Sequence, residues 1–123
     1  MKQQTLIKKE IKYHREKYNK YDDKEQWIRL SDGCYRDCPF CYCPKDKIFY
    51  SFPLLVRNHV KIMDMNFLYS FPDPLETIQE LGDKRVNNKV IYYELICGID
   101  WRLLDLDIAK ALKKSRFINI RLA

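Results

Sequence analysis

Glycine is scarce in this sequence, and long apolar runs are missing from it. Only three of the 123 residues are Gly, while 46% are hydrophobic and 33% charged, which excludes a collagen-like or disordered chain and indicates a globular one. No stretch of about 18 consecutive apolar residues is present, so we expect no membrane-spanning helix. The first 24 residues are charged throughout and lack the apolar core of a signal peptide, which predicts a cytoplasmic protein.

Histidine is also rare, whereas cysteine is concentrated in one place. His14 and His59 lack the spacing of metal ligands, so we interpret both as surface or packing residues. Four of the five cysteines fall within ten residues: Cys34, Cys38, Cys41 and Cys43. In a chain without an export signal, such a cluster predicts metal ligation rather than a disulfide framework. Cys97 stands apart at the end of an apolar run, where we expect a small core residue.

The positive charge of the chain is unevenly distributed. The net charge is +6, and residues 1–24 carry eight basic and four acidic side chains. A basic segment interleaved with tyrosines can contact nucleic acid or acidic lipid, but no nucleic-acid-binding motif accompanies it. We therefore interpret residues 1–24 as a basic N-terminal lead-in, helical or flexible, and expect neither a nucleic-acid nor a membrane partner.

The order of the expected elements predicts an α/β fold. Strands are expected over residues 26–30, 60–68, 90–97 and 117–122. Helices are expected after Pro53, over 75–81 where Gly82 ends the helix, and over 104–112. Such alternation is typical of right-handed parallel units. Because a closed barrel of eight units needs about 250 residues, we predict a partial (βα) barrel, an open parallel sheet of about four strands with covering helices.

The cysteine cluster has the spacing C-x3-C-x2-C and directly follows the first expected core strand, 26–30. Three thiolates on one short loop can converge on three corners of a cubane cluster, and soft thiolate is the ligand that iron–sulfur chemistry favours. The loop also carries basic residues whose charge would offset an anionic cluster: Arg36, Lys45 and Lys47.

At these residues the sequence resembles the radical S-adenosylmethionine superfamily. The signature of that family is C-x3-C-x-aromatic-C, and Phe40 supplies the aromatic residue directly before Cys41. The preceding residues Ser31-Asp32-Gly33 resemble the polar-Gly-Cys sequence at the start of the family's loop. The resemblance is specific in the loop and softer beyond it, and it covers residues 26–123. It implies that residues 25–123 form a truncated radical S-adenosylmethionine core.

The resemblance implies a specific cofactor arrangement. Cys34, Cys38 and Cys41 would each bind one iron of a [4Fe–4S] cluster, and the fourth iron would bind the amino and carboxylate groups of S-adenosylmethionine. A one-electron reductant such as flavodoxin or ferredoxin would then allow cleavage to a 5′-deoxyadenosyl radical, with Phe40 near the adenine. The substrate is not indicated, because substrate-binding groups in this family come mainly from later strands.

Polar residues near the ends of two expected strands are further candidates for cofactor binding. Strand parity puts Asp64 and Asn66 on one face of the second strand and Glu94 on one face of the third. Because a carboxylate is costly beside covering helices, we expect all three to point inward at the carboxyl ends. The resemblance implies that they hold the methionine amine and the ribose. Alternatively, they cap a helix or pair with Arg29 or Arg102.

Two other classes of function remain open. In the first, Cys43 joins the other three cysteines of the loop in a small zinc-binding structural module, although such sites usually combine two separated cysteine pairs. We instead expect Cys43 to be a free thiol. In the second, the chain is an inactive or split cluster-binding fragment, and the open edge of its last strand pairs with a partner chain that completes the sheet.

Overall fold

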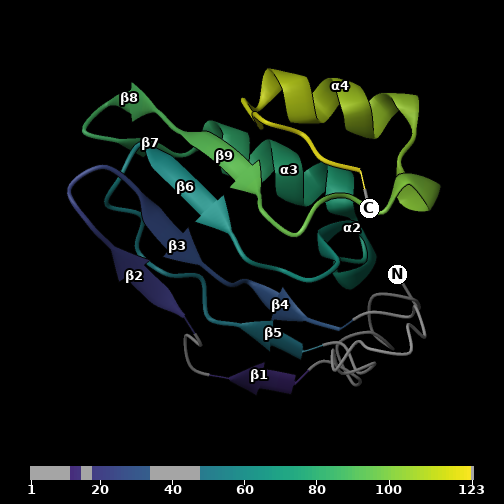
Figure 1. The fold of residues 1–123 in the computed structure, drawn as a ribbon, viewed down its shortest axis with the longest axis horizontal. Helices are drawn as coiled ribbons and strands as arrows, with labels where there is room; N and C mark the ends of the chain where they lie inside the picture. The colour runs from purple at the N-terminus through teal and green to yellow at the C-terminus, as the bar shows by residue number, and fades with distance from the viewer. Residues whose placement is uncertain (1–11, 15–17, 34–47, 123) are drawn as a thin grey trace.

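The computed structural model describes residues 12–14, 18–33 and 48–122. Its largest sheet has four strands in the order β2-β3-β6-β9, with bounds Asn19–Tyr21, Gln26–Ile28, His59–Ile62 and Tyr92–Leu95. Strands β3, β6 and β9 are parallel, and β2 is antiparallel to β3. The carboxyl ends of β3, β6 and β9 therefore lie at the same edge of this sheet (Figure 1).

Two helices cover one face of the sheet, and an aspartate caps the N-terminus of each. Asp73 caps α3 (Pro74–Asp83), in which Pro74 occupies a first position that suits its fixed φ. Asp105 caps α4 (Leu106–Lys114). The last turn of α4 carries two lysines, whose positive charge interacts favourably with the negative end of the helix dipole. A short helix, α2 (Phe67–Ser70), and a 3-10 turn, η1 (Trp101–Leu103), lie in the connections that precede these helices.

Strand register explains why one face is apolar and the other polar. Val60 lies beside Tyr93 and Ile62 beside Leu95, and these four side chains are buried in the core with residues of α3 and α4. The hydroxyl of Tyr93 donates a hydrogen bond to the carbonyl oxygen of Leu81 at 2.6 Å, which connects β9 to α3. The alternate positions of β6 and β9 carry polar side chains on the opposite face.

A smaller sheet lies beside the carboxyl edge of the large one, in the order β1-β5-β4. Its strands are β1 (Lys12–His14), β5 (Ile48–Tyr50) and β4 (Ser31–Asp32). Strand β4 follows β3 after two residues and pairs antiparallel with β5. A two-stranded hairpin, β7 (Arg85–Val86) and β8 (Lys89–Val90), leads from α3 into β9.

The expected α/β class with an open sheet of four strands is confirmed, but the sheet is mostly rather than wholly parallel, because β2 runs antiparallel to β3. Its fourth strand, however, is β2 rather than residues 117–122. That segment makes two isolated parallel bridges, Tyr93 to Phe117 and Ile99 to Leu122. Arg116 and Asn119 have φ values of 64° and 53°, which interrupt an extended strand.

Other expectations about the elements were wrong for identifiable reasons. The strand expected over 60–68 ends at Ile62, because Asn66 caps the helix α2. The described part of residues 1–24 forms strands β1 and β2 rather than a helix, and residues 51–58 after β5 contain no helix. Gly82 lies inside α3 and does not end it.

Gly82 is required by close packing of the two helices rather than by a turn. A Cβ atom at this position would lie 2.5 Å from Oγ and 2.8 Å from Cβ of Ser115, the residue that follows α4.

The helices of the described segments are short. None of them is long and apolar enough to cross a bilayer.

Candidate functional site

The predicted cluster ligands Cys34, Cys38 and Cys41, together with Phe40, lie outside the described residues. The structure does describe both ends of the segment that contains them. Asp32 of β4 lies opposite Ile48 of β5, and Ser31 lies opposite Phe49. We call this antiparallel pair, Ser31–Asp32 with Ile48–Tyr50, the stem of the cysteine loop. Because the stem holds the two ends of the loop side by side, closing the loop around a ligand costs less conformational entropy than it would in a chain with free ends.

Gly33 is the residue between the stem and the first cysteine. It is buried and has a φ of 126°, a backbone conformation that residues with a Cβ rarely adopt. A glycine here permits this backbone conformation at the residue that joins β4 to Cys34 in the sequence. The Gly in the Ser31-Asp32-Gly33 sequence thus has a conformational reason to precede the cysteine loop.

Asp64 lies just beyond the carboxyl end of β6 and is 1% exposed. Its Oδ1 accepts a hydrogen bond from the backbone N–H of Leu30 at 2.7 Å, and its Oδ2 accepts one from the hydroxyl of Ser31 at 2.6 Å. Burial raises the pKa of Asp64 to about 6, although both hydrogen bonds act in the opposite direction. The carboxylate therefore connects the end of β6 to the stem.

A second carboxylate connects the stem internally. Asp32 accepts a hydrogen bond from the Tyr50 hydroxyl and forms an ion pair with Arg29, whose Nη1 lies 2.6 Å from Oδ1. The Asp32 side chain is 5% exposed, so this pairing is shielded from solvent. Burial, and then the neighbouring Asp32 carboxylate, raises the pKa of Tyr50 above its ordinary value. The hydroxyl therefore keeps its proton and remains a donor.

Asn66 acts as a helix cap, one of the alternatives that the sequence left open. Its side-chain oxygen accepts a hydrogen bond from the backbone N–H of Tyr69 at 3.3 Å, at the start of α2. Its amide nitrogen lies 3.4 Å from Oδ2 of Asp100, and Asp100 itself caps η1. Asn66 thus links α2, which follows β6, to η1, which follows β9.

Glu94 lies on the face of the sheet that α3 and α4 do not cover, as expected of a carboxylate that avoids the helices, but its hydrogen-bond partners differ from those of Asp64. The register of β6 and β9 puts Glu94 beside Lys61, on the face opposite Val60 and Ile62. Its Oε2 lies 2.6 Å from Nε2 of His59, and its Oε1 accepts a hydrogen bond from Asn119 at 3.0 Å.

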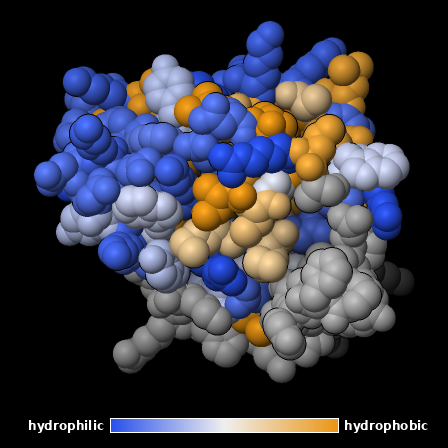
Figure 2. Space-filling view, viewed as in Figure 1, coloured by the Kyte–Doolittle hydropathy of each residue, from blue (hydrophilic) through white to orange (hydrophobic). Residues whose placement is uncertain are grey.

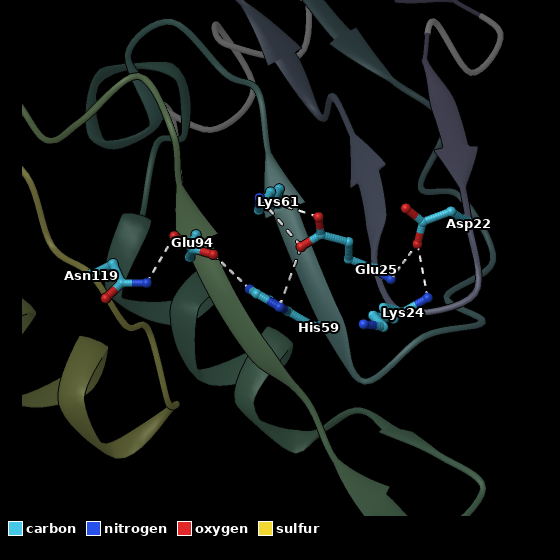
Figure 3. A network of polar contacts seen from close by, with 7 residues as sticks. All are labelled: Asp22, Lys24, Glu25, His59, Lys61, Glu94 and Asn119. Atoms are coloured by element: carbon cyan, nitrogen blue, oxygen red, sulfur yellow. Dashed lines mark hydrogen bonds and ion pairs between the residues drawn. The ribbon is translucent and has the colours of Figure 1, made fainter.

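Figure 3 shows the network to which Glu94 belongs. The other ring nitrogen of His59, Nδ1, lies 3.4 Å from Glu25, and Lys61 lies 3.2 Å from the same carboxylate. Burial alone would raise the pKa of Glu94, but hydrogen bonds from Asn119 and His59 hold it below its ordinary value. Sequence reasoning missed this network and treated His59 as isolated. The alternation of His59 and Lys61 with buried Val60 and Ile62 was the available signal.

The carboxyl edge of the sheet also carries exposed apolar groups. Cys97 lies two residues beyond β9 and is exposed rather than buried in the core, with its Sγ 3.7 Å from the carbonyl oxygen of Met63. Met65, which follows β6 by three residues, is 39% exposed. Figure 2 shows hydrophobic side chains gathered over the ends of β6 and β9, while hydrophilic ones cover the amino ends of the strands.

The arrangement brings three features to one edge of the sheet: the start of the cysteine loop, the buried Asp64 and a partly apolar surface. In α/β sheets this carboxyl edge is where ligands bind. Among residues 12–14, 18–33 and 48–122, no group of three or more His, Cys, Asp and Glu side chains is arranged to hold a metal ion. No protein-family model, curated protein or solved structure matches the chain.

Proposed function

We propose that this chain binds a [4Fe–4S] cluster through Cys34, Cys38 and Cys41 and acts as a radical S-adenosylmethionine enzyme or as part of one. The observation that supports the proposal most is the stem. It joins the two ends of the cysteine loop at the carboxyl edge of three parallel strands, where a bound cofactor would be accessible.

The residues around the loop suit such a cluster in three respects. Three cysteines in one loop supply the soft ligands that iron prefers in these clusters, and the resemblance implies a four-iron cluster in which three protein ligands leave one iron for an exogenous ligand. The apolar surface at the carboxyl edge of the sheet would restrict the access of water to a cofactor bound there. When bound and reduced, the cluster would supply the electron that cleaves S-adenosylmethionine.

Anaerobic reconstitution tests the proposal. The chain is incubated with iron, sulfide and a thiol reductant, and its iron and sulfide contents and visible spectrum are measured. Dithionite and S-adenosylmethionine are then added, and 5′-deoxyadenosine is assayed. We expect a brown protein with equal iron and sulfide contents that forms 5′-deoxyadenosine. A colourless protein that holds one zinc per chain would instead support the zinc-binding structural module.

A second candidate is a cluster-binding chain that needs a partner to be active. Residues 117–122 pair with β9 through one isolated bridge, Tyr93 to Phe117, and with Ile99 beyond β9 through another. Ile120 and Leu122 are 47% and 64% exposed. An apolar pocket of about 410 Å³ lies between this segment and α4. A loaded cluster that yields no 5′-deoxyadenosine until a second chain is added would support this candidate.

A further inference from the structure

We infer that Asp64 is a positioning residue: its carboxylate holds the stem of the cysteine loop at the end of β6 and so determines how firmly the loop retains its metal cluster. The consequence for metal retention rests on the proposed function, but the contact itself does not. Cofactor binding by Asp64, implied by the resemblance, gives a different expectation that the same variants can test.

The geometry of Asp64 directs it toward the stem. Both carboxylate oxygens accept short hydrogen bonds, from the N–H of Leu30 at 2.7 Å and from the hydroxyl of Ser31 at 2.6 Å. Asp64 is 1% exposed and Ser31 is fully buried. The backbone N–H of Ser31 also bonds to this carboxylate. Several hydrogen bonds to one shielded carboxylate fix the position of adjacent residues much more firmly than one bond at the surface would.

Leu30 connects this carboxylate to both ends of the loop. Its N–H donates to Asp64, while its carbonyl oxygen accepts a hydrogen bond from the N–H of Tyr50 at 3.0 Å, on the returning strand β5. On the outgoing side, only Asp32 and Gly33 separate Ser31 from Cys34. A shift of Leu30 and Ser31 would therefore move the outgoing and the returning end of the loop together.

The chemistry of the contact separates positioning from a charged role. An asparagine in place of Asp64 could still accept from the Leu30 N–H through its amide oxygen and could donate its amide N–H to the Ser31 hydroxyl oxygen. It would carry no negative charge to attract the ammonium group of a cofactor. Asp64→Asn should therefore preserve the function of a positioning residue and impair that of a charged ligand contact.

The metal-dependent test compares four variants of the reconstituted chain. Asp64→Ala removes every hydrogen bond to the carboxylate, Ser31→Ala removes only the one from the hydroxyl and leaves no cavity around a lost carboxylate, and Asp64→Asn keeps partners for the Leu30 N–H and the Ser31 hydroxyl. Asp105→Ala serves as the matched control, because it removes an Asp–backbone hydrogen bond at the start of α4. The rate of iron release to a chelator and the yield of 5′-deoxyadenosine are measured for each variant.

We expect iron release several-fold faster in Asp64→Ala, intermediate in Ser31→Ala, and unchanged in Asp64→Asn and Asp105→Ala. Iron release from Asp64→Ala and Ser31→Ala at the wild-type rate would overturn the inference. Normal iron retention by Asp64→Asn combined with loss of 5′-deoxyadenosine would assign Asp64 to the cofactor instead. If Asp64→Ala does not fold, the comparison of Ser31→Ala with Asp64→Asn remains decisive.

The metal-free test distinguishes failure of the inference from failure of the proposed function. Amide hydrogen exchange is measured on the apoprotein, with attention to the N–H groups of Leu30 and Tyr50. Each variant is measured at the same interval below its own unfolding temperature, so that differences in global stability do not enter. We expect both N–H groups to exchange faster in Asp64→Ala and Ser31→Ala than in Asp105→Ala. Unchanged protection would overturn the inference whether or not the chain binds iron, and a wild-type chain that takes up no iron would refute the proposed function alone.

Discussion

His59 on β6 and Glu94 on β9 are joined across the sheet, with Nε2 and Oε2 at 2.6 Å. The pair lies on the face opposite the one that α3 and α4 cover. Because His59 Nδ1 also lies 3.4 Å from Glu25, polar contacts connect three neighbouring segments of the large sheet on this face. The Glu94 side chain is only 8% exposed, so its partners stabilise a charge that burial alone would penalise.

We predict that Glu94→Gln destabilises the protein at neutral pH. The amide can still accept from Asn119, but its NH2 group replaces the carboxylate oxygen that pairs with His59, at a cost of about 1–2 kcal/mol. The pKa of Glu94 is held below its ordinary 4.5, so the unfolded chain takes up the proton first. The stabilisation is therefore complete above pH 4.5 and is lost as pH falls through the lower folded value.

Urea unfolding of both proteins over this pH range measures the effect. The exposed Glu80→Gln on α3 is the matched control, and it should change the free energy of unfolding by less than about 0.5 kcal/mol. A Glu94→Gln deficit that persists unchanged at acid pH would show that it does not arise from the ionised carboxylate.

Asp64 should give the opposite pH dependence. Its pKa is raised from 3.8 to about 6, so the folded protein takes up the proton first. Its contribution to stability is present below pH 3.8 and is lost as pH rises through about 6. We expect the stability of wild type relative to Asp64→Asn to fall by up to about 3 kcal/mol across this interval. Unfolding free energies measured at several pH values test this, and a flat difference would contradict it.

The exposed capping residue Asp73 provides the control for this titration. Asp73→Asn keeps a side-chain oxygen for the N–H of Glu76, at the start of α3. It therefore reports the effect of the same Asp-to-Asn change at an exposed helix cap, measured under the same conditions.

The sequence predicted those parts of the fold that have strong local patterns. The buried strand Tyr92–Leu95 and the helices Pro74–Asp83 and Leu106–Lys114 lie within or close to the expected ranges. It failed where partners distant in sequence decide the structure. Strands β1 and β2 are short and rich in polar residues, and they form because they pair with β5 and β3.

The candidate site shows the same division. The cysteine spacing is a local signal, and Asp64 was recognised because a carboxylate at the end of an apolar strand needs a partner. Its partners, Leu30 and Ser31, lie more than thirty residues earlier, so the sequence did not identify them. Glu94 lies on the face away from the covering helices, as the cost of a carboxylate beside them predicts, but its partners His59 and Asn119 come from other segments, so the sequence did not identify them.

We predict that Gly82→Ala destabilises the protein, although Ala is normally the better helix former by about 1 kcal/mol. A Cβ at this position would meet Oγ and Cβ of Ser115 at 2.5 and 2.8 Å, so α3 and α4 would have to separate. We expect a loss of about 1–3 kcal/mol in thermal or urea unfolding. Combining it with Ser115→Gly removes both clashing atoms and should restore part of the loss, so additive effects of the two changes would contradict this explanation.

The final prediction concerns the cysteines themselves. Changing any one of Cys34, Cys38 or Cys41 to Ala should abolish the reconstituted cluster, because each thiolate would hold a different iron. Cys43→Ala should retain most of the iron, since a single residue separates it from Cys41 and gives little freedom to reach the same cubane. Cys97→Ala is the matched control from outside the loop. Iron content and the visible spectrum are measured after anaerobic reconstitution. If Cys43→Ala loses its iron as completely as the other three variants, the site has four protein thiolates and no vacant iron for S-adenosylmethionine, and the proposed enzymatic function is refuted.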